Sequence, residues 1–178
     1  MKNITKVELL SQIENVKNNY ILGLASISVL SEPFAAKHLR KTRCVFGEYF
    51  VDFHQVATLL ANDVDRSIAL KEFTTMLIRG LLKESFEIVR AYTKATQQSQ
   101  KFKAQSWFQF FRLIRNCVSH NFCFEFSKSD KDLLPVLWHG RKIDNSLDHQ
   151  PLEIPFLGYD GVWDLFSELM LFVNEHLT

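Results

Sequence analysis

Apolar residues recur along this chain at spacings of three and four, the pattern of α-helices that bury one face. In the first stretch, from Val7 to Leu30, the pattern falls on Val7, Leu10, Ile13, Val16, Tyr20 and Leu24. A second stretch follows Asp63 or Asp65, either of which can cap a helix, and continues to about Ala95. A third runs from Phe102 to about Ser119. These stretches predict an all-α fold, a helical bundle of four to five helices.

Shorter elements are expected between the long helices. A short helix is predicted within Phe46 to Leu60, and the polar string Thr96 to Gln100 predicts a connection. Leu134 to Trp138 and Arg141 to Ile143 predict a small irregular or β-hairpin insertion before the last helix, which Asp160 is expected to cap.

The composition agrees with long regular elements and one core. The 178 residues are 47% hydrophobic and include sixteen phenylalanines against six glycines and four prolines. A globular domain of this size buries roughly 70% of the surface that its unfolded chain exposes, which is enough for a stable core without disulfide bonds or metal ions. We therefore expect a single helical domain over residues 1–178.

Cysteine usage and hydropathy bear on the compartment. The three cysteines, Cys44, Cys117 and Cys123, are an odd number, and no leading segment resembles a secretory signal. No apolar run approaches the ~20 residues needed to cross a bilayer. The sequence thus predicts a cytoplasmic protein without a membrane partner.

The formal net charge of +1 argues against a broad nucleic-acid-binding surface, because such a surface would be strongly basic. One basic cluster stands out: Lys37, His38, Arg40, Lys41 and Arg43. Two interpretations stay open for it, a solvated connection or a local contact with RNA phosphates.

The third stretch separates polar from apolar residues around a helix. At about 100° per residue, one side collects the apolar residues Trp107, Phe110, Phe111, Ile114, Cys117 and Val118. The other side collects the polar residues Arg112, Arg115, Asn116, Ser119 and His120. Arg115 and His120 lie about 140° apart on an ideal helix, so they flank a polar groove in which a phosphate could lie.

The hexad Arg115-Asn116-Cys117-Val118-Ser119-His120 resembles the signature of HEPN domains, an arginine and a polar residue followed by a histidine four to six positions after the arginine. HEPN domains are small helical bundles with this signature near the end of the penultimate helix. The order of expected elements fits over residues 60–178.

The resemblance implies a homodimer in which two signatures form one cleft. Many members cleave RNA there without metal or cofactor, often as a toxin or antiviral defence component, whereas others do not cleave. Partners implied are RNA and a second copy of the chain, and a cognate antitoxin or a nucleotidyltransferase stays open. The alternative is a non-catalytic nucleotide-binding or protein-interaction module.

Cleavage requires a base for the ribose 2′-hydroxyl, and the imidazole of His120 can exchange protons near neutral pH. Arg115 would stabilise charge on the phosphate, and Asn116 would orient the histidine or hold a phosphate oxygen. The resulting RNA fragment would end in a 2′,3′-cyclic phosphate.

Further polar residues around the signature have two interpretations each. Arg112 and Ser119 are expected to bind substrate, although helix dipoles also favour an arginine near a C-terminal turn. No base and orienting acid adjoin Ser119, so it is not expected to be a nucleophile. Glu84 and Glu87 could reach the cleft, but surface pairing with Arg90 is the simpler expectation.

A metal centre is one rival interpretation. Cys117, His120 and Cys123 are possible metal ligands, with His139 or Cys44 as a fourth, but paired C-x-x-C spacing is missing and no metal is expected.

The last helix is apolar more widely than one stripe requires, so it could be core, dimer interface or partner surface. Glycine-loop and G-x-S-x-G motifs are also missing, which argues against nucleotide hydrolysis and triad hydrolysis.

Overall fold

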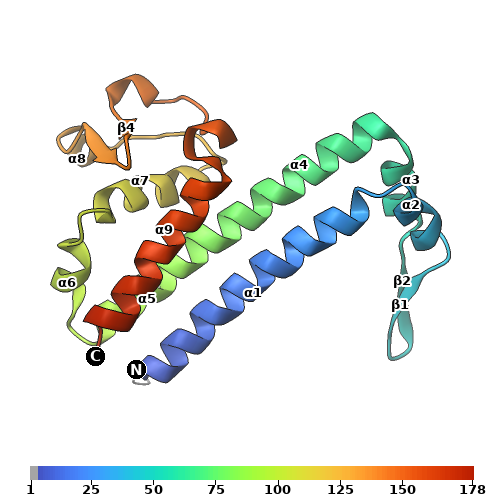
Figure 1. The fold of residues 1–178 in the computed structure, drawn as a ribbon, viewed down its shortest axis with the longest axis horizontal. Helices are drawn as coiled ribbons and strands as arrows, with labels where there is room; N and C mark the ends of the chain where they lie inside the picture. Colours follow the sequence, from blue (N-terminus) through green and yellow to red (C-terminus); the bar gives the residue numbers. More distant parts are fainter. Residues whose placement is uncertain (1–3) are drawn as a thin grey trace. The chain divides into compact units, whose positions relative to one another are not determined.

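The computed structural model describes residues 4–178, and the chain is mostly helical, with two small antiparallel hairpins. It divides into two compact units: unit 1, made of Met1–Lys17 and Ile78–Thr178, and unit 2, made of Asn18–Leu77. The boundaries fall inside two long helices, α1 (Lys6–Leu30) and α4 (Asp63–Arg79) (Figure 1). Among the described residues, no helix is long and apolar enough to cross a membrane.

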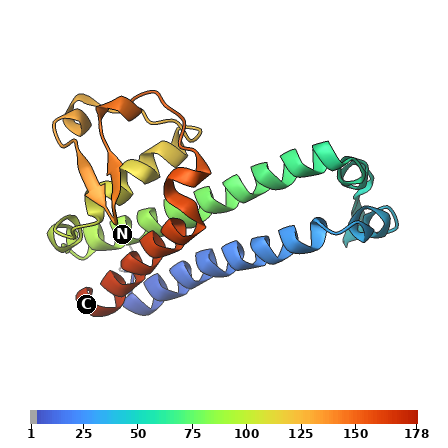
Figure 2. The same cartoon turned by 45° about the horizontal axis from the view of Figure 1, so that its top comes forward.

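Unit 1 holds most of the secondary structure (Figures 1 and 2). After the end of α4 come the π-helical turn η1 (Gly80–Glu84), α5 (Ser85–Ala95), α6 (Ser99–Lys103), α7 (Phe108–Ser119), α8 (Lys128–Lys131), β3 (Val136–Trp138), β4 (Arg141–Ile143), the 3₁₀ turn η2 (Asn145–Leu147) and α9 (Ile154–His176). The hairpin predicted before the last helix is confirmed, with Trp138 opposite Arg141. The helix predicted from Phe102 to Ser119 is interrupted between Lys103 and Phe108.

The core of unit 1 is aromatic. Phe86 of α5 lies 5.2 Å from both Phe102 of α6 and Phe111 of α7, measured between ring centroids, and Phe102 stacks on Phe172 of α9 at 5.4 Å. Full burial of one such side chain stabilises the fold by about 1.5–3 kcal/mol. The apolar side predicted for α7 is confirmed, because all six of its residues are buried.

The first turns of α1 belong to the same core. Leu9 and Ile13 are fully buried, and the Lys6 ammonium donates hydrogen bonds to the backbone carbonyls of Asn174 (3.1 Å) and Leu177 (2.5 Å) at the end of α9. The N-terminal part of α1 is therefore tied to the last helix within unit 1.

The last helix has two parts. It begins at Ile154, preceded by Glu153, and Gly158 breaks it with a φ of +73°, a value that glycine adopts without the strain of a Cβ. The second and longer part resumes beside Asp160, where the sequence placed the start of this helix. Most of its apolar excess is core, since Leu165, Phe166, Leu169, Phe172 and Val173 are buried, although Leu171 is 53% exposed.

Unit 2 departs most from expectation. Where a helix was predicted from Phe46, the chain forms the hairpin β1 (Arg43–Phe46) and β2 (Tyr49–Asp52), and α3 spans only His54–Ala61. The reason is local: Gly47 turns the chain with a φ of +60°, and the aromatic and β-branched residues on either side of it favour strands. The remaining helix of this unit is α2 (Phe34–Leu39).

The long helix predicted from Asp63 or Asp65 to Ala95 is present as α4, η1 and α5 in succession. Its cap is a different residue from the two expected. The Asn62 side-chain oxygen accepts hydrogen bonds from the backbone N–H groups of Val64 (2.9 Å) and Asp65 (3.1 Å), as an N-cap does.

Candidate functional site

Helix α7 positions the signature because its buried side fixes its rotation in the core of unit 1. Arg115, Asn116 and Ser119 lie on its half-buried side, and the helix ends at His120. The His120 backbone N–H donates to the carbonyls of Asn116 (3.1 Å) and Cys117 (3.0 Å), which closes the last turn. The helical part of the predicted polar face is thus present in the fold, whereas His120 has left the helix, with a φ of −103° and a ψ of 53°.

Arg115 is held by two partners. Its Nη1 donates a 2.8 Å hydrogen bond to the side-chain oxygen of Asn116, and its Nη2 forms an ion pair with Glu87 of α5. Its Nε is buried and has no hydrogen-bond partner among the described residues. Desolvation by burial lowers the pKa of Arg115 from its ordinary value. Glu87 and Asn116 therefore orient the guanidinium, whose Nε–H points into the protein.

Glu87 joins two arginines. Besides Arg115, it pairs with Arg90 at 2.5 Å, one turn further along α5. The expected pairing with Arg90 is therefore present, and the second pairing, with the signature arginine, adds a role that spacing alone did not assign. Glu84, the other carboxylate considered, is exposed.

His120 lies at the open end of this face, with 57% of its side chain exposed. Its Nδ1 is 3.6 Å from the Glu125 carboxylate, long for a hydrogen bond but close enough to attract an imidazolium. Glu125 was missed from the sequence, because a carboxylate five residues beyond a helix end has no fixed direction.

The backbone after α7 explains how Glu125 returns to His120. Asn121 and Phe122 both have positive φ, +54° and +58°, which reverses the chain. The turned segment then pairs with the approach to α9: Leu152 donates to the Phe122 carbonyl at 2.6 Å and Phe124 to the Gln150 carbonyl at 2.9 Å. These hydrogen bonds fix the segment that carries Glu125.

Arg112 and Ser119 have structural partners of their own. Arg112 forms a 2.6 Å ion pair with Asp130, which is 4% exposed, and a 2.9 Å hydrogen bond with Gln109. The Ser119 hydroxyl donates to the Arg115 carbonyl at 2.8 Å. Substrate binding by these two residues stays a prediction, and any phosphate on Arg112 would compete with Asp130.

The cysteines considered as metal ligands differ in environment. Cys117 is buried, and desolvation, followed by the nearby Cys123, raises its pKa to about 12, which disfavours the thiolate that metals bind. Over residues 4–178, no three His, Cys, Asp or Glu side chains gather as a metal site would require.

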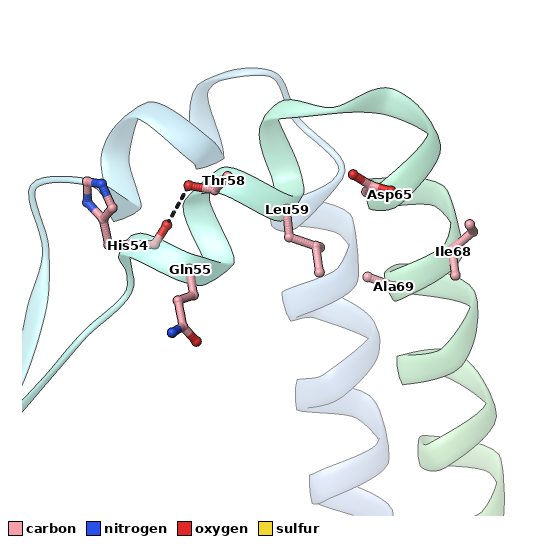
Figure 3. A pocket seen from close by; sticks show the side chains of 7 residues that line it. All are labelled: His54, Gln55, Thr58, Leu59, Asp65, Ile68 and Ala69. Carbon is pink, nitrogen blue, oxygen red and sulfur yellow. Dashed lines mark hydrogen bonds between the residues drawn. The ribbon is translucent and has the colours of Figure 1, made fainter.

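A cavity of about 530 Å³ lies elsewhere, in unit 2 (Figure 3). Its lining is mainly apolar and consists of His54, Gln55, Thr58, Leu59, Asp65, Ile68 and Ala69. The Thr58 hydroxyl donates to the His54 backbone carbonyl at 3.0 Å, which is a bond within α3. Its lining shares no residue with the signature.

No protein-family model, no curated protein sequence and no solved structure matches the chain. Function is therefore inferred from the site itself and from the resemblance of its hexad.

Proposed function

We propose that this chain is a HEPN-like, metal-independent endoribonuclease that acts as a homodimer. One observation carries the proposal: Glu87 and Asn116 orient Arg115, while the exposed His120 follows directly on the same helix. A fixed cation beside an imidazole that can accept a proton is what phosphodiester cleavage by a 2′-hydroxyl needs.

The proposed reaction breaks one P–O bond and forms another. His120 removes the proton of the ribose 2′-hydroxyl, and the 2′-oxygen attacks the adjacent phosphorus. The 5′-oxygen of the next nucleotide leaves and takes a proton from His120 of the partner subunit. The products are a 2′,3′-cyclic phosphate and a 5′-hydroxyl, and no metal ion is required.

The surrounding residues prepare these two groups. Arg115 donates a planar fork of N–H groups to the phosphate oxygens, where negative charge grows in the transition state. Glu87 and Asn116 hold that fork in place before RNA binds. Glu125 attracts His120 through Nδ1, which leaves Nε2 directed to the substrate.

A second copy completes the site in this proposal. With its histidine more than half exposed, the site on one protomer is open to water, which weakens every electrostatic contact there. A facing signature excludes water and supplies the second histidine. A toxin or antiviral defence role, with an antitoxin or nucleotidyltransferase as regulator, belongs to the same proposal.

The test is incubation of total cellular RNA with wild-type protein, Arg115→Ala and His120→Ala in excess chelator, followed by analysis of the fragment ends. His149→Asn is the matched control, because His149 is a strongly exposed histidine of the same unit. Cyclic phosphate ends from the wild type and the control alone support the proposal. Intact RNA in every lane, with folded and dimeric proteins, favours the non-catalytic module.

A further inference from the structure

The hairpin of unit 2 exposes an unusual amount of apolar surface. Of its residues, Val45, Phe46, Tyr49, Phe50 and Val51 are each 50–80% exposed, and Tyr49 reaches 80%. Isolated two-stranded hairpins are marginally stable in water, and exposed aromatic rings add nothing to the core. We call Arg43–Asp52 the aromatic hairpin.

Its register presents rings on both faces. Phe46 pairs with Tyr49 across the turn, so their side chains share one face, whereas Phe50 pairs with Val45 on the other. The Arg43 guanidinium lies 5.5 Å from the centre of the Phe50 ring, within cation–π range. Flat rings and a stacked cation are thus available to a ligand.

The adjoining segment is positively charged. Between Glu32 and Glu48 the chain carries Lys37, Arg40, Lys41 and Arg43 and no carboxylate. Within residues 4–178, Lys37, Arg40 and Lys41 have no ion-pair partner within 4.0 Å, whereas the cations of the signature face, Arg112 and Arg115, are both paired. Exposed cations without counter-charges favour an anionic ligand.

Two of these cations also border a hollow. Lys37 and Arg40 line a cavity of about 380 Å³ in unit 2, together with the ion pair of Arg66 and Asp63 (2.7 Å), which adds no net charge. The two unpaired cations therefore give the lining a net positive charge beside a concave surface that could hold a phosphate.

We propose that the aromatic hairpin and Lys37, Arg40 and Lys41 bind an unpaired RNA strand, with phosphates on the cations and bases stacked on the rings. The proposal rests on the proposed ribonuclease function and names where unit 2 holds substrate RNA. Aromatic rings beside a cationic track are how single strands are bound without sequence preference. In a duplex the bases already stack on one another and the rings would gain little.

Two other occupants fit less well. A membrane surface would meet the tip of the hairpin first, and the tip carries the exposed carboxylate of Glu48. In a symmetric contact with a second copy, the unpaired cations of one protomer would face those of the other.

The test uses full-length protein and a short fluorescein-labelled 2′-O-methyl oligouridylate, which lacks the 2′-hydroxyl needed for cleavage. Fluorescence anisotropy gives the affinity at a series of salt concentrations. We expect the slope of log affinity against log salt to fall in magnitude by about 0.7 for each cation removed in Lys37→Gln and Arg40→Gln. Lys71→Gln, at an exposed lysine of α4 in the same unit, is the matched control and keeps the wild-type slope.

The rings are tested separately by Phe46→Leu and Tyr49→Leu, which keep apolar area but remove the stacking plane. Each is expected to weaken binding about tenfold. Wild-type affinity in these variants, equal affinity for the annealed duplex, or binding to phosphatidylcholine–phosphatidylserine vesicles without binding to the oligonucleotide would overturn the proposal. If binding requires the hairpin but natural RNA is not cleaved, the ribonuclease function is refuted and the binding surface is retained. If natural RNA is cleaved but the hairpin variants bind the oligonucleotide as tightly as the wild type, the binding surface is refuted and the ribonuclease function is retained.

Discussion

Removal of the Asp130 carboxylate should destabilise unit 1 more than any surface substitution near it. Asp130 is 4% exposed, ion-pairs with Arg112 at 2.6 Å, and accepts hydrogen bonds from the Ser127 backbone N–H (2.9 Å) and hydroxyl (2.6 Å). Breaking a buried pair costs about 3–5 kcal/mol, and loss of a capping contact costs about 1 kcal/mol. Because Arg112 keeps some exposure and can rehydrate, we expect Asp130→Ala to cost about 3 kcal/mol.

The assay is thermal unfolding at neutral pH followed by circular dichroism. A cost of about 3 kcal/mol lowers the Tm of a chain of this size by about 6–12 °C. Asp132→Ala, at an exposed aspartate two residues away, is the control and should shift the Tm very little. In a double-mutant cycle, Asp130→Ala should cost much less when Arg112→Gln is already present.

The pH dependence follows from the sign of the shift. Burial raises the pKa of Asp130, but the hydrogen bonds from Ser127 and Arg112 outweigh it and hold the pKa below its ordinary value. The stabilisation is therefore fully present above the unfolded-state pKa of about 3.9 and is lost as pH falls through the lower folded value. A Tm for Asp130→Ala within the error of the wild type at neutral pH, or strictly additive effects with Arg112→Gln, would refute the reasoning.

Three further predictions concern other parts of unit 1. Glu87→Gln removes the charge that orients the signature arginine, so RNA cleavage should fall at least tenfold in initial-rate assays while the circular dichroism spectrum is unchanged; undiminished cleavage would contradict a positioning role. Iodoacetamide should modify Cys123 well before Cys117 in mass spectrometry of the native protein, since burial raises the Cys117 pKa to about 12, and equal rates would contradict the buried environment. Gly158→Ala should cost about 1–2 kcal/mol in urea unfolding, because an alanine is strained at a φ of +73° and its Cβ would meet the Asp160 carboxylate; Gly80→Ala, where a Cβ meets nothing within 4 Å, is the control and should cost nothing.

The helical character of the chain could be predicted because the spacing of apolar residues on a helix face depends only on residues that are close together in the sequence. The extent of the first helix, the buried side of α7 and the hairpin at β3 and β4 all follow from local patterns. The face predicted to be buried on α1 was wrong in part, because Val7 is 77% exposed and Leu24 is 37% exposed. The prediction failed where local signals conflicted: the helix expected from Phe46 gave way to strands because Gly47 takes a positive φ and turns the chain.

The residues of the candidate site could likewise be predicted only in part. The hexad singled out Arg115, Asn116 and His120, but only the first two lie within α7, where residues have fixed relative directions. The partners of these side chains come from other segments: Glu87 lies 28 residues before Arg115, by the numbering, and Glu125 reaches His120 only through two residues of positive φ.

The sequence by itself therefore determined which faces of the helices are apolar and which residues could perform chemistry, because periodicity and side-chain type are local properties. The tertiary structure decided which charges are neutralised. It paired Arg112 with Asp130 and Arg115 with Glu87, while Lys37 and Arg40 kept no ion-pair partner among the described residues. Such pairings depend on how distant segments pack together, and no spacing along the chain specifies that.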